Sequence, residues 1–291
     1  MKPKEAFSVF LKGLFMGMAD IIPGVSGGTI ALVTGIYERL VHSISRVEPH
    51  FIVHFLKGDM KKGMGSVRKI DFELFIPLLL GIGIAVWLMS NVISFMLKSH
   101  PVPSFSFFFG LILASAIIIY KTAGRLTPKK LAISVAGFVF AFILSGVNGI
   151  EMGHSLPVIF ASGAAAICAM ILPGISGALI LLLIGQYEFM LNALRGFQIP
   201  EIAAFCIGAL LGIIVFSRLL SRLLKKYRSY TMFFLTGLMV GALRVPYENI
   251  MVDIGSPIPV IISAAIGFVV VFGIERPAKK PVQKTLHEIM E

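Results

Sequence analysis

Long apolar runs separated by short polar stretches cover most of the chain. An apolar stretch of about 20 residues is long enough for a helix that crosses a lipid bilayer. Most of the runs approach or exceed that length, so the pattern predicts an all-α polytopic membrane protein. The ten runs lie at residues 5–22, 25–45, 72–97, 103–120, 130–147, 155–172, 175–194, 199–217, 230–247 and 257–275.

Two neighbouring pairs of runs are separated only by a turn that contains Pro-Gly. The first turn reads Asp20-Ile-Ile-Pro-Gly-Val-Ser-Gly-Gly28, and the second reads Pro173-Gly-Ile-Ser-Gly177. Proline and glycine interrupt helices, so each pair predicts a helical hairpin, of the re-entrant kind, with an irregular tip. Irregular backbone inside a membrane is tolerated only where protein or water satisfies its polar groups. Such a tip is a candidate binding site; the alternative is a kink that lets helices pack closely.

The two turns belong to an internal repeat. Residues 19–38 align with residues 169–188 at a constant offset of 150, with 11 of the 20 positions identical. A weaker match follows at an offset of 127, where Gly81 corresponds to Gly208 and Gly110 to Gly237. We therefore expect one membrane domain over 1–291 that is built from two repeats. The expected boundaries are 5–148 for the first repeat, with an insertion at 46–71, then 149–277 for the second repeat and 278–291 for a tail.

Each repeat is expected to contain one hairpin and three transmembrane helices. A hairpin returns the chain to the side from which it came, and three crossings move it to the other side. The second repeat then starts on the opposite face of the membrane, so the two repeats are inverted.

The distribution of basic residues supports the same topology. Cytoplasmic loops of membrane proteins are rich in Lys and Arg. Four connections of this chain are basic, and they alternate with connections that hold at most one such residue. The pattern predicts cytoplasmic N- and C-termini, with six full crossings and two hairpins between them. The basic stretches are 46–71, 121–130, 218–228 and 276–284.

The insertion at 46–71 allows two interpretations. Its basic residues fit an interfacial amphipathic helix on anionic membrane lipids, and they fit a solvated loop equally well.

Composition narrows the class of protein. The chain is 57% hydrophobic and 14% charged, which is too apolar for a soluble domain of 291 residues. The basic residues behind the net charge of +11 are scattered in short clusters. We therefore expect these charges to orient the chain in the membrane rather than to bind nucleic acid.

No residue pattern indicates a bound cofactor. Cys168 and Cys206 lie in apolar stretches, and the histidines show no metal-ligand spacing, so neither a metal nor another cofactor is expected. Residues 1–12 lack a small-residue cleavage site and are expected to be retained.

Both turns have the composition of an anion site. A serine suits a helix N-cap, and glycines let a ligand approach the backbone. The first amide groups of a helix lack intrahelical partners and lie at the positive end of its dipole, which favours phosphate. Two opposed turns would surround one anionic group near the middle of the bilayer. The candidate phosphate-binding residues here are Gly24, Ser26, Gly27, Gly28, Gly174, Ser176 and Gly177.

Charged residues near the hairpins are candidates for gating or for ion coupling. Carboxylates within apolar segments are unfavourable and usually functional. Glu38 and Glu188 share the context Gly-x-Tyr-Glu, 12 residues after each serine, which on a continuous helix is about 18 Å away. They predict gates or proton sites, and interfacial anchors are the alternative. The same candidate set contains Asp20, Tyr37, Arg39 and Tyr187, and Asp20 has no counterpart because Met170 occupies the matching position.

Arg244 is a further candidate for the phosphate site. It ends an apolar run in the sequence Gly241-Ala-Leu-Arg-Val-Pro246. Its guanidinium would bind a phosphate through paired hydrogen bonds, or it would extend to lipid headgroups instead.

The turn sequences carry a resemblance to a known family. Met18-Ala-Asp-Ile-Ile-Pro-Gly-Val-Ser-Gly-Gly-Thr-Ile-Ala and Ile167-Cys-Ala-Met-Ile-Leu-Pro-Gly-Ile-Ser-Gly177 resemble two signatures of the bacterial polyprenyl-phosphate transporter family. Residues 237–246 resemble a third signature, and the likeness extends over about 5–277. Ala178 departs from it, because relatives often carry serine there.

The resemblance implies a flippase that returns undecaprenyl phosphate from the outer to the inner leaflet of the bacterial cell membrane. The lipid would be reused in the synthesis of cell-wall peptidoglycan, and proton or cation coupling is a further expectation. The resemblance implies this lipid as a partner, and the basic insertion at 46–71 adds anionic membrane lipids as expected partners. The oligomeric state stays open, with a homodimer among the alternatives.

Two other functions remain as alternatives. A membrane undecaprenyl-diphosphate phosphatase has similar hairpins, but there an arginine follows the serine, where this chain has Gly27 and Gly177. A phosphoryl-transfer site without that cation lacks its main stabilising group, so no enzyme is expected. A carrier of small anions fits the turns equally well on physical grounds.

Overall fold

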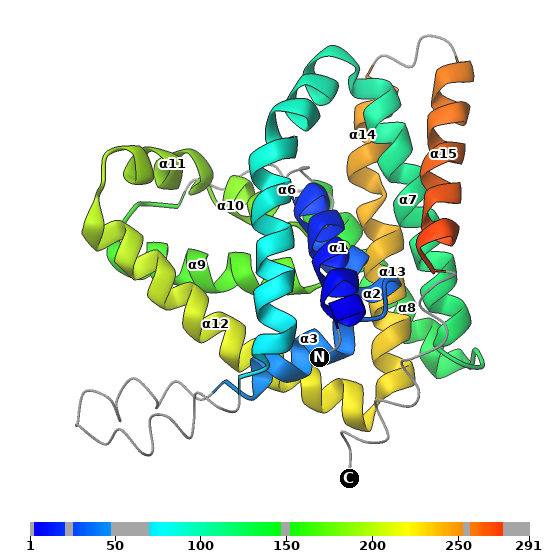
Figure 1. Cartoon of the computed structure of the whole chain (residues 1–291), viewed down its shortest axis with the longest axis horizontal. Helices are drawn as coiled ribbons and strands as arrows, with labels where there is room; N and C mark the ends of the chain where they lie inside the picture. Colours follow the sequence, from blue (N-terminus) through cyan, green and yellow to red (C-terminus); the bar gives the residue numbers. More distant parts are fainter. Residues whose placement is uncertain (1–2, 21–25, 48–69, 147–151, 253–256, 276–291) are drawn as a thin grey trace.

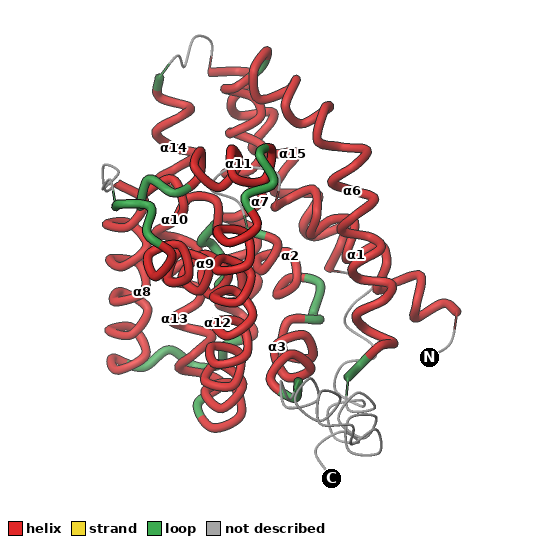
Figure 2. Tube along the Cα trace, turned by 90° about the vertical axis from the view of Figure 1, so that its left-hand side faces the viewer, coloured by secondary structure: helices red, strands yellow, loops and turns green. Residues whose placement is uncertain are grey.

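The computed structural model of the chain describes residues 3–20, 26–47, 70–146, 152–252 and 257–275. Within these ranges every regular element is a helix, and no strand occurs (Figures 1 and 2). The prediction of an all-α protein is confirmed.

The helices match the ten apolar runs closely, with three exceptions. The second arm of each hairpin is two short helices rather than one long helix, and the run at 230–247 is broken between α13 and α14. In the first half the helices are α1 (Pro3–Asp20), α2 (Gly27–Val33), α3 (Tyr37–Ser45), α6 (Phe72–Ser99), α7 (Pro101–Thr122) and α8 (Pro128–Gly146). In the second half they are α9 (Leu156–Ile171), α10 (Gly177–Leu183), α11 (Tyr187–Arg195), α12 (Ile199–Lys226), α13 (Arg228–Ala242), α14 (Arg244–Met251) and α15 (Pro257–Glu275).

A glycine ends the helix after each turn, which corrects the expectation of a continuous arm. Gly35 and Gly185 have φ angles of 75° and 68°, in the left-handed region. The Gly35 amide donates to the Leu32 carbonyl, and the next amide donates five residues back to Ala31, which together form a Schellman C-cap. The second half repeats these bonds from Gly185 and Gln186, and α10 and α11 meet at a bend of 107°. The 18 Å separation expected between each turn serine and its glutamate therefore does not apply.

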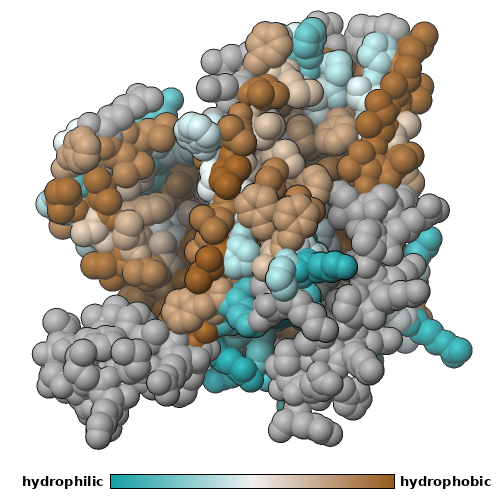
Figure 3. Space-filling model, viewed as in Figure 1, coloured by the Kyte–Doolittle hydropathy of each residue, from teal (hydrophilic) through white to brown (hydrophobic). Residues whose placement is uncertain are grey.

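Several helices are long and apolar enough to cross a membrane. Four meet that description, namely α6, α7, α8 and α12, and the bent pair α10–α11 would make a fifth. The helices α9 and α15 are apolar but shorter. The surface is strongly apolar too, with Trp87 78% exposed and Val215 and Val269 each 66% exposed (Figure 3). These features mark a multi-pass membrane protein, while six full crossings stay a prediction.

Helix packing follows the duplication seen in the sequence. Within each half, the first hairpin arm packs along the first long helix, as α1 on α6 and α9 on α12. The remaining helices are exchanged between halves, because α7 packs on α15 and α13 packs on α8. Each pair corresponds to another pair under the repeat, so the helices of the two halves interlock in the described part of the chain. How the repeats are oriented in a membrane stays a prediction.

Small residues allow the exchanged helices to touch backbone to backbone. A side chain on Gly110 would collide with the Ala264 carbonyl, and one on the repeat-related Gly237 would collide with the Ser134 carbonyl. The close approach therefore occurs at equivalent places in the two halves. This is the small-residue packing that membrane helices favour.

Two predicted features lie outside the described residues. Most of the insertion at 46–71, with its choice between amphipathic helix and loop, falls in the range 48–69. The tail at 278–291 also falls outside.

Candidate functional site

The first turn holds its helix start with two side chains. Ser26 is the N-cap of α2, and its Oγ accepts a hydrogen bond from the Gly28 amide at 3.1 Å. The Gly27 amide donates to Oδ1 of Asp20 at 2.7 Å. The Asp20 carboxylate therefore lies at the start of α2, in the position expected for an anion at a helix N-terminus. Gly24 lies outside the described residues.

The second turn lacks the side-chain hydrogen bonds that hold the helix start in the first turn. Gly174 has a φ angle of 87°, so the backbone there uses the conformational freedom of glycine. Ser176 is the N-cap of α10 by position but makes no capping hydrogen bond, in contrast to Ser26. Met170 stands where the first turn has Asp20, and so supplies no carboxylate.

The two turns are in direct contact, although 150 residues separate them in the chain. Oγ of Ser26 donates to the carbonyl oxygens of Leu172 at 3.2 Å and Met170 at 3.4 Å. The Gly174 amide donates to Oγ1 of Thr29 at 3.0 Å. Each turn therefore satisfies polar groups of the other.

The junction of the turns is closed in this conformation. Ser26, Thr29 and Ser176 are 1%, 0% and 5% exposed, and Gly27, Gly28 and Gly177 are buried. The amides of Gly27 and Gly28, expected to be unpaired, already have acceptors within the chain. A phosphate can reach these amides only if the turns separate and Asp20 gives up its hydrogen bond.

Glu38 is held in an ion pair rather than presented to a ligand. Its Oε1 lies 2.7 Å from Nε of Arg228, at the start of α13. The neighbouring Tyr37 is fully buried, and its hydroxyl is the one buried side-chain polar atom of the described residues without a hydrogen-bond partner.

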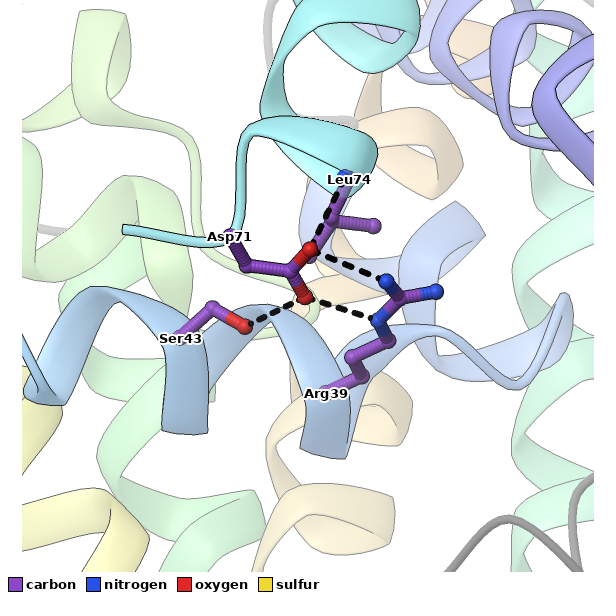
Figure 4. A network of polar contacts seen from close by, with 4 residues as sticks. All are labelled: Arg39, Ser43, Asp71 and Leu74. Atoms are coloured by element: carbon purple, nitrogen blue, oxygen red, sulfur yellow. Dashed lines mark hydrogen bonds and ion pairs between the residues drawn. The ribbon is translucent and has the colours of Figure 1, made fainter. Parts of the chain in front are cut away.

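Arg39 belongs to a second polar cluster at the start of α6 (Figure 4). Its guanidinium forms two hydrogen bonds to Asp71, at 2.9 and 3.0 Å. The same carboxylate accepts from Ser43 and caps α6 through the Leu74 amide. The cluster fastens α3 to the first residues of α6.

The repeat-related residues of the second half lack these partners. Glu188 is exposed and Tyr187 is partly exposed. No ion pair to Glu188 occurs among the described residues, and Phe189 takes the place of Arg39. Phe189 instead stacks on His154, with ring centroids 4.1 Å apart.

Arg244 ties α14 to α8. Its Nε lies 2.6 Å from Oε1 of Glu248, and its Nη1 donates to the Phe142 carbonyl at 3.0 Å. The guanidinium also lies over the Phe142 ring. No hydrogen bond joins it to either turn within the described residues. It lines a surface groove of about 280 Å³ whose other walls are mainly aromatic and aliphatic, including Phe109 and Tyr247.

Sequence reasoning missed four residues that hold the first hairpin: His42, Asp71, Ser221 and Arg228. Asp71 had a usable signal, because an aspartate directly before an apolar run is a helix N-cap. The others had none, because their partners lie far away in the chain. His42 Nδ1, for example, lies 3.2 Å from Oγ of Ser221.

Comparisons with known proteins identify the family of the chain. The sequence profile of a family described as undecaprenyl phosphate translocase-like matches residues 16–254. A protein of Vibrio cholerae named polyprenyl-phosphate transporter is 43% identical over 243 residues, covering 83% of this chain and 78% of its own. A Staphylococcus aureus protein of the same name is 30% identical over 280 residues, covering 89% and 93%. No solved structure matches the chain. By the extent of the profile match and by these identities, the chain belongs to the undecaprenyl phosphate translocase-like family.

Proposed function

We propose that this protein transports a polyprenyl phosphate across the cell membrane and acts as a transporter rather than an enzyme. Its family and the printed names of its relatives support this function. The direction proposed is from the outer to the inner leaflet, which returns undecaprenyl phosphate to cell-wall synthesis. The N- and C-termini lie in the cytoplasm in this proposal, and the two repeats are inverted.

The phosphate is proposed to bind where the two turns meet. The observation that carries this proposal is the Asp20 carboxylate, which accepts the Gly27 amide at 2.7 Å. An oxyanion of the protein thus occupies the helix start at which the substrate phosphate would lie. The substrate replaces Asp20 when the turns separate, and Asp20 replaces the substrate on release.

This exchange gives Asp20 a part in the transport cycle. A carboxylate at that point would repel a bound phosphate, so protonation or withdrawal of Asp20 favours binding. Proton coupling through one carboxylate is consistent with its absence from the second turn, where Met170 stands. Glu38 and Glu188 serve as gates in this proposal. The other proposed phosphate-site residues are Gly24, Ser26, Gly28, Gly174, Ser176, Gly177 and Arg244.

The test is leaflet exchange of a labelled polyprenyl phosphate in vesicles that contain the purified protein. The double variant Ser26→Ala and Ser176→Ala is expected to lower the exchange rate about tenfold, because it removes the N-cap hydrogen bond of Ser26, the link between the turns and both serine hydroxyls of the proposed site. Arg244→Ala, at the proposed site residue outside the turns, is expected to lower headgroup binding as well, and unchanged binding would remove Arg244 from the site. Unchanged exchange in the double variant would remove the turns from the site. Release of phosphate from a polyprenyl diphosphate by the purified protein would instead favour an enzyme.

A further inference from the structure

The two halves of the protein have the same parts but are not packed in the same way. In the first half α3 packs along α12. The repeat-related pair in the second half is α11 and α6, and these two helices have little or no contact. Figure 1 shows the difference, because α3 lies against the lower end of α12, whereas α11 lies well to the left of the upper part of α6.

Several polar contacts hold α3 in place. Arg228 pairs with Glu38 at 2.7 Å, and His42 lies 3.2 Å from Ser221. Arg218 donates to the backbone carbonyls of Ser45 and Val47 at 3.3 and 3.2 Å. These contacts all join the end of the first hairpin to residues 218–228.

Burial shows that the same surface is closed in one half and open in the other. Val41 of α3 is completely buried, whereas its counterpart Leu191 of α11 is 36% exposed. Tyr37 is 1% exposed, and its counterpart Tyr187 is only partly buried. The residue pairs are separated by 150 positions, as in the turns.

The two hairpins share Gly-x-Tyr-Glu and end α2 and α10 with the same C-cap, while Arg39 and His42 of α3 are replaced by Phe189 and Asn192 in α11. Two repeats with matching local structure but different packing can exchange their arrangements. From these observations we infer that α3 packed on residues 218–228 forms a closed gate. The equivalent gate of α11 and α6 is in its open form, because these two helices lack the corresponding contact, and the two gates open alternately.

The charge distribution assigns a side to each gate, given the topology of the proposed function. The closed gate lies among Arg218, Arg222, Lys225, Lys226 and Arg228, which belong on the cytoplasmic side. By this assignment the gate that is closed in the structure is the cytoplasmic one, and the outer gate is the one whose helices are not packed together.

The buried hydroxyl of Tyr37 lowers the stability of the closed gate. Its buried hydroxyl has no hydrogen-bond partner, and an unsatisfied buried hydroxyl disfavours the state that contains it. Opening the gate exposes the hydroxyl to partners. Tyr37→Phe therefore favours the closed gate, and Tyr187→Phe, at the partly exposed counterpart, is the matched control.

The first test measures labelling of single cysteines by a membrane-impermeant maleimide in a background with Cys168→Ala and Cys206→Ala. Leu191→Cys is expected to react at least tenfold faster than Val41→Cys. Addition of a soluble short-chain polyprenyl phosphate is expected to raise labelling at position 41 and lower it at position 191. Equal reactivity of the two cysteines, or changes in the same direction, would overturn the alternating gates.

The second test fixes the gate with a disulfide. The variant with His42→Cys and Ser221→Cys, in the same background, is expected to stop leaflet exchange when the disulfide forms and to restore it on reduction. In the labelling test, adding Tyr37→Phe is expected to lower the labelling of Val41→Cys about fivefold. Full exchange in the oxidised protein would refute the gate.

The inference rests on the proposed transport, but the two fail in different ways. Opposite labelling changes without any leaflet exchange of polyprenyl phosphate would leave the gates standing and refute the transport function. Leaflet exchange with equal labelling at both positions would refute the gates alone.

Discussion

The two hairpins have similar local sequences, but the polar side chains around their turns differ. Each has a serine at a helix start, a seven-residue helix and a glycine C-cap, but only Ser26 makes a capping hydrogen bond. The first hairpin adds the polar side chains Asp20 and Thr29, where the second has Met170 and Leu179. Because Thr29 also accepts the Gly174 amide, the first hairpin supplies polar partners to both turns. The second turn depends on the first for its hydrogen bonding.

The comparison also separates the part of the molecule where the two halves bond to each other from the part where their packing differs. The turns are buried and bonded to each other, whereas α3 and α11 differ in packing. Substitutions at the turns should therefore act on folding or on headgroup binding. Substitutions at the ends of the hairpins should act on the balance between gates.

The largest effect is expected from Gly174→Val. The residue has a φ of 87°, and a Cβ there would lie 2.9 Å from the Met239 Cα, so strain and backbone collision combine. We expect a loss of about 3 kcal/mol or more and little folded protein after detergent extraction. Gly83→Ala is the control, because a Cβ at Gly83 meets no atom within 4 Å. Normal yield and thermal stability of Gly174→Val would show that the second turn is not constrained as described.

Thr29→Val tests whether the first turn supports the second. The substitution keeps the shape but removes the acceptor of the Gly174 amide in a fully buried position. An unsatisfied buried amide costs about 1–3 kcal/mol, so thermal unfolding should move to lower temperature. Leu179→Val, at the repeat-related position, should cost less than about 1.5 kcal/mol. Equal destabilisation by the two variants would contradict the dependence.

Asp20→Asn tests the exchange between carboxylate and phosphate. The amide oxygen can still accept the Gly27 hydrogen bond, but the competing negative charge is removed. Charge at a helix start is worth roughly 1 kcal/mol, so affinity for a soluble polyprenyl phosphate should rise about fivefold in an equilibrium binding measurement. Met170→Asn is the matched variant and should change affinity little. Weaker binding by Asp20→Asn would mean that the carboxylate assists the substrate instead of competing with it.

Glu38→Gln and Glu188→Gln should give the smallest effects and should differ from each other. Glu38 loses its ion pair with Arg228, whose side chain is half exposed, so the cost should stay below about 1 kcal/mol. Glu188 has no ion pair to lose among the described residues, and its variant should unfold at the unchanged temperature. Calorimetric or fluorescence melting curves decide the comparison. A larger shift for Glu188→Gln would reverse the assignment of closed and open sides.

Much of the fold was accessible from the sequence because it depends on local patterns. Apolar runs located the helices, and Pro-Gly located both turns. The breaks at Gly35 and Gly185 were also readable, since a glycine after an apolar run is a common C-cap, but the apolar pattern continues past them and suggested one long helix. The break before Arg244 had no comparable signal.

The candidate site was only partly accessible. Ser26 and Ser176 were identified as N-cap residues from their place before the glycines, and Ser26 does cap α2. The sequence also marked Asp20 as unusual. It did not show that this carboxylate accepts the Gly27 amide, because the contact depends on how α1 and α2 pack against each other.

The amino-acid sequence alone determined a membrane-embedded helical protein with a duplicated architecture and two serine-glycine turns. These properties follow from side-chain hydrophobicity and backbone preference, which act within a few residues. Only the tertiary structure decided that α7 pairs with α15 and α8 with α13, that the turns bond to each other, and that α3 packs where α11 does not. Contacts of that kind join residues more than a hundred positions apart, and the choice between two similar packings depends on the whole set of helices.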